Sequence, residues 1–240
     1  SECRHLMLST LERHKAQELA KNFKYIDYNL FGTITGRLTT NPGSFPVLTL
    51  KKEFRKLLKP NNDLFVALDY NGAEVRTFLE LAGHEQPDYD IHDWNVRNVF
   101  ANTLTRDEAK VEFFGWLYNS REDAVLSEIY DKDSVLDKWY NGDYIITPYN
   151  RQIEVDDFKA LNYIIQSTTA DRVLSKAVII DKMLEDRKSY ISHILHDEIV
   201  IDFDNEDGDI IMEIKAVFED GYLSTMKAGK NYFELSELSL

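Results

Sequence analysis

The chain has 240 residues, of which 43% are hydrophobic, enough to bury the core of one large domain or two small ones. No run approaches about 18 uncharged apolar residues, so we expect no membrane span. The N-terminal stretch SECRHLMLSTLERHK lacks the succession of basic, apolar and small residues that is typical of a secretory signal. The formal net charge of −14 argues against a general polyanion binder, because binding to nucleic acid depends on Lys and Arg side chains that neutralise phosphates.

The only cysteine, Cys3, cannot form an internal disulfide, which fits a reducing cytosol. We expect a cytoplasmic location in a bacterial or phage-infected cell, with an organelle as the alternative. Charge is unevenly spread along the chain: residues 51–59, KKEFRKLLK, form a basic cluster, whereas part of the acidic excess lies in 202–220. Each of these runs is also compatible with an ordinary solvated surface.

Hydrophobic periodicity, caps and turn residues predict the elements in chain order. In the first half we expect helices at 4–22 and 51–58, a strand at 65–69, a helix at 73–82 that Gly83 ends, and helices at 91–100 and 106–118. In the second half we expect a hairpin at 143–155, a long helix at 156–187, a hairpin at 191–203, a helix from about 208 to 226, and a short final strand. Helices mixed with antiparallel hairpins, without repeats or a flexible linker, indicate the α+β fold class.

Two aspartates interrupt or end apolar runs. In ISHILHDEIVIDF (191–203) the titratable residues His196, Asp197 and Glu198 separate side chains that favour burial, and Asp69 ends the strand FVALD. An unpaired buried carboxylate is costly, so the hairpin either exposes Asp197 at a solvated tip or presents it to a cation. Mg²⁺ prefers oxygen ligands. Two aspartates at neighbouring strand ends could hold two ions about 3.5–4 Å apart, the arrangement used for in-line phosphoryl displacement.

Simpler interpretations of these acidic residues remain open. Each aspartate could be a turn residue, and the Asn-Gly pair at 71–72 is typical of a hairpin turn. The stretch FDNEDGD resembles a calcium loop, but aligning Gly208 with the sixth position puts Phe203 at the first, where a carboxylate is needed. A calcium site there is therefore excluded.

The helix predicted at 106–118 has an unusual face. Arg106, Lys110, Phe114 and Tyr118 follow one another at intervals of four, so all four lie along one side. The two cations suit a triphosphate, and the two aromatic rings suit a sugar and a base. The alternative is an ordinary surface next to an ordinary core, in which Phe113 and Trp116 are expected to pack in either case.

Six segments together resemble the family A DNA polymerases, the DNA polymerase I type. DYNGAEVR (69–76) resembles motif A, usually written DYSQIELR, RDEAKVEFFGWLYN (106–119) resembles motif B, and HDEIV (196–200) resembles motif C. ITGRLTT (34–40) resembles the TGRLSS element, DIH (90–92) occurs between motifs A and B, and NYIIQSTTAD (162–171) resembles the NAPMQGTAAD helix. The six segments come in the family's order, which makes the match far more specific than any one motif.

The resemblance implies a polymerase palm, an antiparallel sheet backed by helices, with a short helical fingers subdomain. It places the first part of the palm in residues 1–90, the fingers in 91–140 and the second part of the palm in 141–240. Residues 1–33 carry none of the motifs, and no thumb or exonuclease domain is recognisable. We therefore expect either a fragment or one subunit of a split polymerase, with a second polypeptide that supplies the thumb or exonuclease.

The activity that the resemblance implies is template-directed DNA synthesis. The enzyme would add dNTPs to the 3′-hydroxyl of a primer on a DNA template, by nucleotidyl transfer with two Mg²⁺ ions and release of pyrophosphate. Three alternatives remain: a non-catalytic or partner-dependent palm subunit, a single-subunit RNA polymerase, and an acidic interaction domain. Glu74 argues against the RNA polymerase, because a bulky side chain at that place excludes a ribose hydroxyl.

The resemblance also assigns roles to individual residues. The metal would be bound by Asp69, Asp197 and the carbonyl of Tyr70, and catalysis would involve Asp69, Asp197, Lys110 and Glu198. The dNTP would be bound by Arg106, Lys110, His92, Phe114, Tyr118 and Glu74. The DNA would be bound by Arg37, Asn162, Gln166 and His196. Gly72 and Asn119 depart from the family's pattern, which has Gln and Gly there, and Gly72 removes an expected contact with the minor groove.

Overall fold

The computed structural model describes residues 14, 26–118 and 123–238. The helix expected at 4–22 therefore lies, apart from residue 14, outside the described residues, and so do Cys3 and Asn119. Within the part of the chain that is described, no helix has both the length and the apolar character needed to cross a bilayer.

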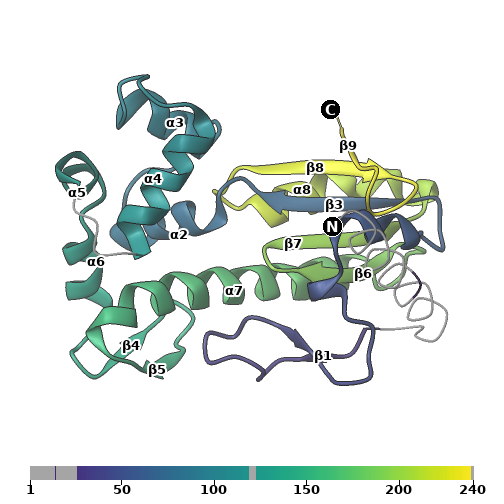
Figure 1. Ribbon diagram of the computed structural model, residues 1–240. Helices are drawn as coiled ribbons and strands as arrows, with labels where there is room; N and C mark the ends of the chain where they lie inside the picture. The colour runs from purple at the N-terminus through teal and green to yellow at the C-terminus, as the bar shows by residue number, and fades with distance from the viewer. Residues whose placement is uncertain (1–13, 15–25, 119–122, 239–240) are drawn as a thin grey trace, which may run out of the picture.

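A five-stranded antiparallel sheet, in the order β6-β7-β3-β8-β9, forms one part of the molecule (Figure 1). Its strands are β3 (Leu64–Tyr70), β6 (Tyr190–Leu195), β7 (Glu198–Phe203), β8 (Ser224–Gly229) and β9 (Ser236–Glu237). The sequence LFVALDY takes the central position because its apolar side chains can be buried on both faces. Together with the helices behind this sheet, the arrangement confirms the predicted α+β class.

The two faces of β3 pack against different partners. Val66, Leu68 and Tyr70 belong to a core shared with helices α7 (Asp157–Met183) and α8 (Ile211–Glu219). Phe65 and Ala67 belong to a second core on the other face of the sheet. Since side chains alternate along a strand, Asp69 shares the face of Phe65 and Ala67 and points away from α7 and α8.

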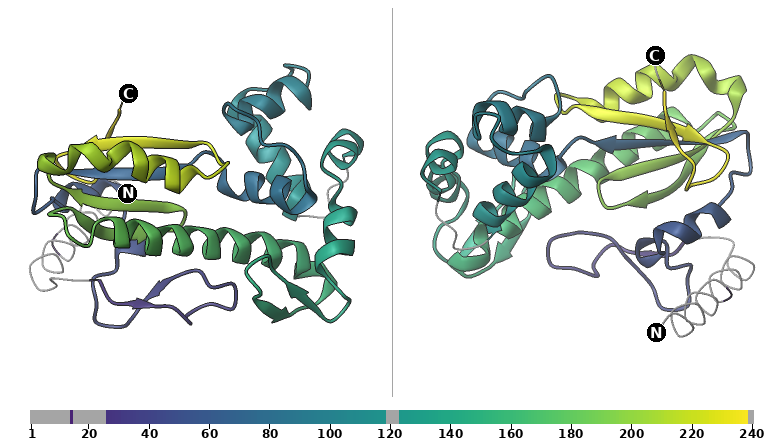
Figure 2. Two further views of the ribbon diagram at one scale, coloured as in Figure 1. Left: turned by 180° about the vertical axis from the view of Figure 1, so that it is seen from behind. Right: turned by 45° about the horizontal axis from the view of Figure 1, so that its top comes forward.

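The other part of the molecule is mainly helical, and α7 connects it to the sheet. Figures 1 and 2 show α7 running from the helical end to beneath the sheet, with α8 against the sheet from behind. A buried aromatic cluster of Phe78, Phe113, Trp116 and Tyr130, with neighbouring ring centroids 4.8 to 6.2 Å apart, forms the centre of the helical part. The elements around it are α2 (Ala73–Ala82), α3 (Ile91–Asn98), α4 (Arg106–Tyr118), α5 (Ala124–Tyr130), α6 (Lys132–Trp139), β4 (Tyr144–Ile146) and β5 (Gln152–Glu154).

A short N-terminal hairpin, β1 (Tyr28–Asn29) and β2 (Thr39–Thr40), lies against β6. The Tyr28 hydroxyl donates to the carbonyl of Ile194 at 2.7 Å and accepts from its N–H at 2.9 Å. These two bonds bring the loop that carries Arg37 close to the β6–β7 hairpin.

Two of the predicted helices were wrong in kind or length. In place of the α-helix expected at 51–58, the chain forms a 3₁₀ helix, η2 (Lys52–Leu57), and a shorter 3₁₀ turn, η1 (Val47–Thr49), precedes it. Pro60 disfavours the helical conformation for Lys59, so the segment cannot readily continue as a helix. The helix expected from about 208 to 226 consists of a 3₁₀ segment, η3 (Asn205–Ile210), followed by α8, which ends at Glu219. Asp220 and Gly221 both take positive φ, which stops the helix and allows β8 to begin.

Helices α5 and α6 were not predicted from the sequence. Each is short and each begins at an aspartate cap: the side chain of Asp123 accepts from Leu126 N–H at 2.9 Å, and that of Asp131 from Ser134 N–H at 3.1 Å. A cap without a long periodic segment after it is a weak signal, so these helices depend on tertiary packing: α5 packs on α4 through Tyr130, and α6 packs on α2 and α7.

Asp202 in β7 anchors the loop that leads into β3. Its side chain is buried, and its carboxylate accepts hydrogen bonds from the N–H groups of Asn61 (2.7 Å) and Asn62 (2.8 Å) and from the Tyr190 hydroxyl (2.9 Å). We predict that Asp202→Ala lowers the free energy of unfolding, measured in urea, by about 2 to 4 kcal/mol, because several donors lose a charged acceptor. The exposed Asp186→Ala control should change it by less than about 0.5 kcal/mol. Equal effects of the two substitutions would contradict this account.

Candidate active site

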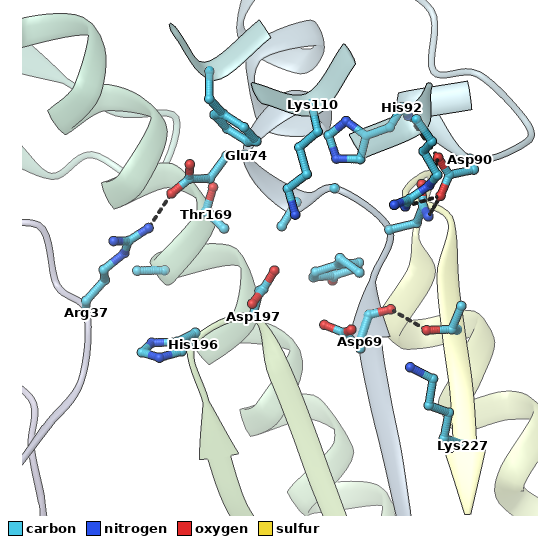
Figure 3. Close-up of a pocket in the computed structure, with 18 residues that line it drawn as sticks. Arg37, Asp69, Glu74, Asp90, His92, Lys110, Thr169, His196, Asp197 and Lys227 are labelled. Atoms are coloured by element: carbon cyan, nitrogen blue, oxygen red, sulfur yellow. Dashed lines mark hydrogen bonds and ion pairs between the residues drawn. The ribbon is translucent and has the colours of Figure 1, made fainter. Parts of the chain in front are cut away.

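A cavity of about 520 Å³ opens where the sheet meets the helical part. Figure 3 shows side chains converging on it from the end of β3, the β6–β7 hairpin, α2, α3, α4, α7 and β8, and from the loop before β2. The segments that meet here lie far apart in the chain, from Arg37 to Lys227.

The β6–β7 hairpin explains the acidic interruption of an apolar run. Strand β6 ends at Leu195 and β7 begins at Glu198, so His196 and Asp197 form a two-residue turn. His196 has a φ of 56°, in the left-handed region that glycine usually occupies in such turns. The apolar neighbours therefore remain in the sheet, while the turn brings Asp197 into the cavity.

Asp69 and Asp197 lie next to each other in the cavity (Figure 3). Burial, followed by the negative charges of Asp197 and Glu198, raises the pKa of Asp69 to about 7, although the positive charges of Lys227 and Lys110 act in the opposite direction. Burial likewise raises the pKa of Asp197. Two carboxylates held together against their repulsion are stabilised by a cation between them, so this pair fits a divalent metal ion.

The donor set for a metal is small. Among the described residues, no group of three or more His, Cys, Asp or Glu side chains is arranged to hold a metal ion. Two carboxylates and a backbone carbonyl, such as that of Tyr70 at the cavity, suit Mg²⁺, which usually takes its remaining ligands from water and substrate phosphates. They do not suit a structural zinc site, which needs four protein ligands.

Helix α4 presents the predicted face of cations and aromatic rings to the cavity. Lys110 and Phe114 line it, and the ring of Tyr118 stacks behind that of Phe114, with centroids 5.9 Å apart and planes 16° apart. Phe113 and Trp116 point the other way and are fully buried, as expected.

Glu74, in the first turn of α2, connects two distant segments. One oxygen of its carboxylate pairs with Arg37, and the other accepts a hydrogen bond from the Tyr118 hydroxyl at 2.8 Å. Burial raises the pKa of Tyr118, and the charge of Glu74 raises it further, so this hydroxyl stays protonated and can donate. Glu74 therefore fixes the side chain of Tyr118 beside the cavity.

Asp90 fixes the start of α3 and the first cation of α4. Its carboxylate accepts from the N–H groups of His92 (2.9 Å) and Asp93 (3.0 Å) and from two nitrogens of Arg106 (2.7 and 3.1 Å). Partial burial acts to raise the pKa of Asp90, but the hydrogen bonds from Arg106 and Asn71 hold it well below its usual range. Arg106 thus lines the cavity while it is engaged in a bidentate ion pair.

His92 lines the cavity as a neutral ring. Burial, together with the neighbouring charges of Lys110 and Arg106, lowers the pKa of His92 to about 4. Its Nδ1 atom is buried and has no hydrogen-bond partner among the described residues. The ring is therefore available as a neutral hydrogen-bonding group at neutral pH.

Gly72 is required by the backbone at the junction of β3 and α2. Its φ is 65°, and the side chain of Ile91 occupies the place that a Cβ atom at this position would take. The Asn-Gly pair at 71–72 therefore starts a helix here and does not form a hairpin turn.

Arg76 holds the loop between α2 and α3. The side chain is fully buried and donates to the backbone carbonyls of Asn71 (2.8 Å), Pro87 (2.9 Å) and Tyr89 (2.8 Å). Because these carbonyls satisfy the buried guanidinium, the loop that ends at Asp90 has a defined path to the cavity.

Most, but not all, of the predicted site residues line the cavity. Those that do are Arg37, Asp69, Tyr70, Glu74, His92, Arg106, Lys110, Phe114, His196 and Asp197. Glu198 does not: it lies opposite Asp69 in the sheet, and its carboxylate accepts a hydrogen bond from Tyr232. Asn162 and Gln166 hydrogen bond to each other on α7, where they lie two turns and one turn, respectively, before Thr169 and Ala170, which line the cavity. Asn162 and Gln166 therefore lie on the same face of α7 as the residues that line the cavity.

Sequence reasoning missed several lining residues: Asn71, Asp90, Thr169, Thr225 and Lys227. A cap signal marked Asp90, since it precedes a helical pattern. Thr225 and Lys227 had no signal, because the sequence pattern predicts a helix over part of this segment.

The comparisons with known proteins agree with the predicted resemblance. No protein-family model matches the sequence. The chain is 25% identical over 237 residues to DNA polymerase I of Caldicellulosiruptor bescii, which covers 76% of this chain and 28% of that protein. The structure of this chain matches the POL domain of Pol1 from M. smegmatis, which was solved in complex with DNA primer-template and dNTP. The TM-score is 0.67 and the sequence identity is 16%, and the match covers 88% of this chain and 48% of the solved chain.

These matches confirm the likeness to DNA polymerase I-type proteins, and the structural match confirms the palm-type fold with an antiparallel sheet backed by helices. The chain spans about a quarter of the length of the curated relative and about half of the solved chain that it matches.

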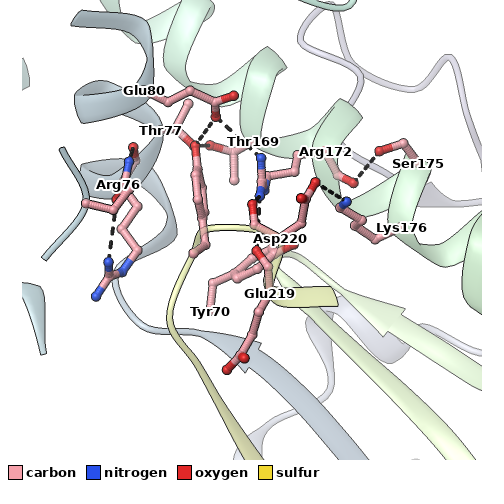
Figure 4. A network of polar contacts seen from close by, with 12 residues as sticks. Tyr70, Arg76, Thr77, Glu80, Thr169, Arg172, Ser175, Lys176, Glu219 and Asp220 are labelled. Carbon is pink, nitrogen blue, oxygen red and sulfur yellow. Dashed lines mark hydrogen bonds and ion pairs between the residues drawn. The ribbon is translucent and has the colours of Figure 1, made fainter. Parts of the chain in front are cut away.

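A buried polar network behind the cavity holds its walls together (Figure 4). Arg172 of α7 lies 3.7 Å from the ring centroid of Tyr222, donates to the carbonyls of Glu219 (3.1 Å) and Asp220 at the C-terminal end of α8, and pairs with Glu80 of α2 at 3.5 Å. The hydroxyl of Tyr222 also donates to Glu80. One guanidinium therefore connects α7, α2 and the end of α8.

We predict that Arg172→Met lowers the free energy of unfolding by about 2 to 4 kcal/mol, because it leaves buried acceptors without their donor. Urea denaturation measures this effect. The matched control is Lys159→Met on the exposed first turn of the same helix, where a surface ion pair with Asp156 is lost at a cost below about 1 kcal/mol. A change of the same small size in both variants would show that the network contributes little.

Proposed function

We propose that this chain is the core of a template-directed DNA polymerase, which adds dNTPs to the 3′-hydroxyl of a primer and releases pyrophosphate. The observation that carries the proposal is the pair of carboxylates, Asp69 and Asp197, facing a helix that presents Lys110 and Phe114 across one cavity. The fold of the polymerase domain that it matches supports the proposal. Residues 1–90 and 141–240 would form the palm and 91–140 the fingers.

Mg²⁺ fits the donor set described above, and Asp69, Asp197 and the Tyr70 carbonyl would hold it. When bound, divalent ions lower the pKa of an attacking hydroxyl and neutralise charge on the reacting phosphates. The chain's own residues would then position the substrates. The primer 3′-hydroxyl gives its proton to solvent as its oxygen attacks the α-phosphorus, the bond from that phosphorus to the bridging oxygen breaks, and pyrophosphate leaves.

The residues on α3 and α4 would bind the incoming nucleotide. Lys110 would contact the triphosphate as a point charge, and the neutral ring of His92 would donate or accept a hydrogen bond there. Phe114 would stack on the sugar and base, with Tyr118 behind it next to the templating position. Arg106 would hold phosphate from within its ion pair with Asp90, or after exchanging that carboxylate for phosphate.

The DNA would lie along the side of the cavity formed by Arg37, His196 and α7. Asn162 and Gln166, on the same face of α7 as the cavity residues, would reach minor-groove acceptors, which every base pair presents. The thumb or exonuclease functions on a second polypeptide remain a prediction.

Removing either charge at the carboxylate pair should abolish the reaction. We predict that Asp69→Asn and Asp197→Asn each slow single-nucleotide extension of a primed template in Mg²⁺ by at least about a thousandfold, because Asn keeps the size but loses the charge that a hard cation requires. Thermal melting should show that both variants fold.

The exposed Asp186→Asn variant is the control and should extend at the wild-type rate. A rate near wild type for either cavity variant would disprove the metal assignment. A wild-type chain that extends no primer with dNTPs or rNTPs would disprove the proposed function itself.

Sugar selection should depend on the bulk of Glu74. We predict that Glu74→Ala lowers the preference for dNTPs over rNTPs by about tenfold or more in a competition assay, and that it slows normal incorporation, because Tyr118 loses its acceptor.

Glu74→Gln separates size from charge: if exclusion of the 2′-hydroxyl is steric, this variant keeps most of the preference although its pairing with Arg37 is weakened. Glu85→Ala, on the exposed loop after α2, is the unaffected control. An unchanged dNTP/rNTP ratio in Glu74→Ala would refute the assignment.

A further inference from the structure

Lys227 shares the face of the sheet that carries Asp69. In the pairing of β3 with β8, Ala67 lies opposite Lys227 and Asp69 lies opposite Thr225. Since side chains alternate, Thr225 and Lys227 point to the same side as Asp69, and both line the cavity. Figure 3 shows the ammonium group of Lys227 directed toward Asp69 from the side of the cavity opposite Lys110.

The four cationic side chains of the cavity differ in what they contact. Arg37 is paired with Glu74, and Arg106 is paired with Asp90. By contrast, within residues 26–118 and 123–238 the side-chain ammonium groups of Lys110 and Lys227 make no hydrogen bond or ion pair. The two lysines are therefore the cations whose donors are available to a ligand.

Neutralisation of the acidic neighbours does not account for Lys227. Its charge acts on Asp69 and Glu198 at a distance, but it forms an ion pair with neither, and Glu198 already accepts a hydrogen bond from Tyr232. Other described lysines that neutralise an acidic side chain form a direct ion pair with it, as Lys176 does with Asp220 at 2.5 Å. The open position of Lys227 leaves room for an anion.

We infer that Lys227 is a phosphate-binding residue, which holds the terminal phosphates of the incoming nucleotide, and then the leaving pyrophosphate, from the side of the sheet. This inference rests on the proposed polymerase function. The strand order favours a phosphate of the nucleotide over a phosphate of the DNA as the ligand. Asp197 and His196 lie on the β7 side of Asp69, toward the proposed path of the DNA, whereas Lys227 lies on the β8 side. Figure 3 places Asp90 and His92 on that same side of the cavity.

A pair of lysines on opposite walls suits pyrophosphate for a physical reason. The anion carries several charges and must sit close to two carboxylates that repel it, so a single lysine compensates this repulsion poorly. Lys110 from α4 and Lys227 from β8 would each supply a charge-assisted hydrogen bond. Lys227 thereby takes part in binding the substrate and retaining the product.

The test measures affinity for inorganic pyrophosphate directly, by titration calorimetry on the full chain in Mg²⁺, and as product inhibition of primer extension. We expect Lys227→Met to weaken pyrophosphate binding about tenfold, equivalent to about 1.4 kcal/mol at 25 °C. The KM for dNTP should rise by a similar factor, with a smaller change in kcat. Lys227→Arg, which keeps the charge, should restore most of both.

Lys230→Met is the matched control. Lys230 follows β8, is exposed, and donates to the carbonyl of Asp63 at 2.6 Å outside the cavity, so its loss should leave pyrophosphate affinity unchanged. Unchanged pyrophosphate affinity in Lys227→Met, in a wild-type chain that extends primers, would overturn this inference alone. Weaker primer-template binding with unchanged pyrophosphate affinity would overturn it in favour of a DNA phosphate contact. A wild-type chain without extension activity would overturn the proposed function and this inference with it.

Discussion

The antiparallel pairing of β3 with β7 and β8 is the constraint on which the rest of the structure depends. It puts Asp69 between Glu198 on one side and Thr225 on the other. A shift by one residue would turn Asp69 toward the core of α7 and α8, where Tyr70 now packs on Phe218 with ring centroids 4.0 Å apart. The register is therefore held by the apolar side chains, and the acidic site follows from it.

The same pairing holds like charges close together, and cations from both the sheet and the helical part act against their repulsion. Asp69 and Asp197 repel each other in a partly buried place, and the cations come from segments as distant as α4 and β8. Arg37 and Arg106 form ion pairs with Glu74 and Asp90, respectively, and these ion pairs fix the two arginines in the wall of the cavity. The lysines are not bound in this way, and on the proposed assignment they receive the phosphates.

Rigid support for this arrangement comes from buried polar groups. Arg76 donates to backbone carbonyls of the loop before α3, and Arg172 donates to carbonyls at the C-terminal end of α8. Each guanidinium replaces water around backbone groups that would otherwise be costly to bury. Neither arginine lines the cavity, but their hydrogen bonds fix the backbone of segments next to it.

The sequence by itself determined the local features: the strand that ends at Asp69, the face of α4, the two-residue turn at Asp197 and the long helix α7. Each rests on side-chain periodicity or on a cost of burial, which depend on near neighbours alone. Only the tertiary structure decided that Lys227 lies beside Asp69, that Arg106 pairs with Asp90, and that Glu198 points to Tyr232. Those outcomes depend on which strands pair and in which register, and a periodic pattern specifies which residues are buried without specifying their partners.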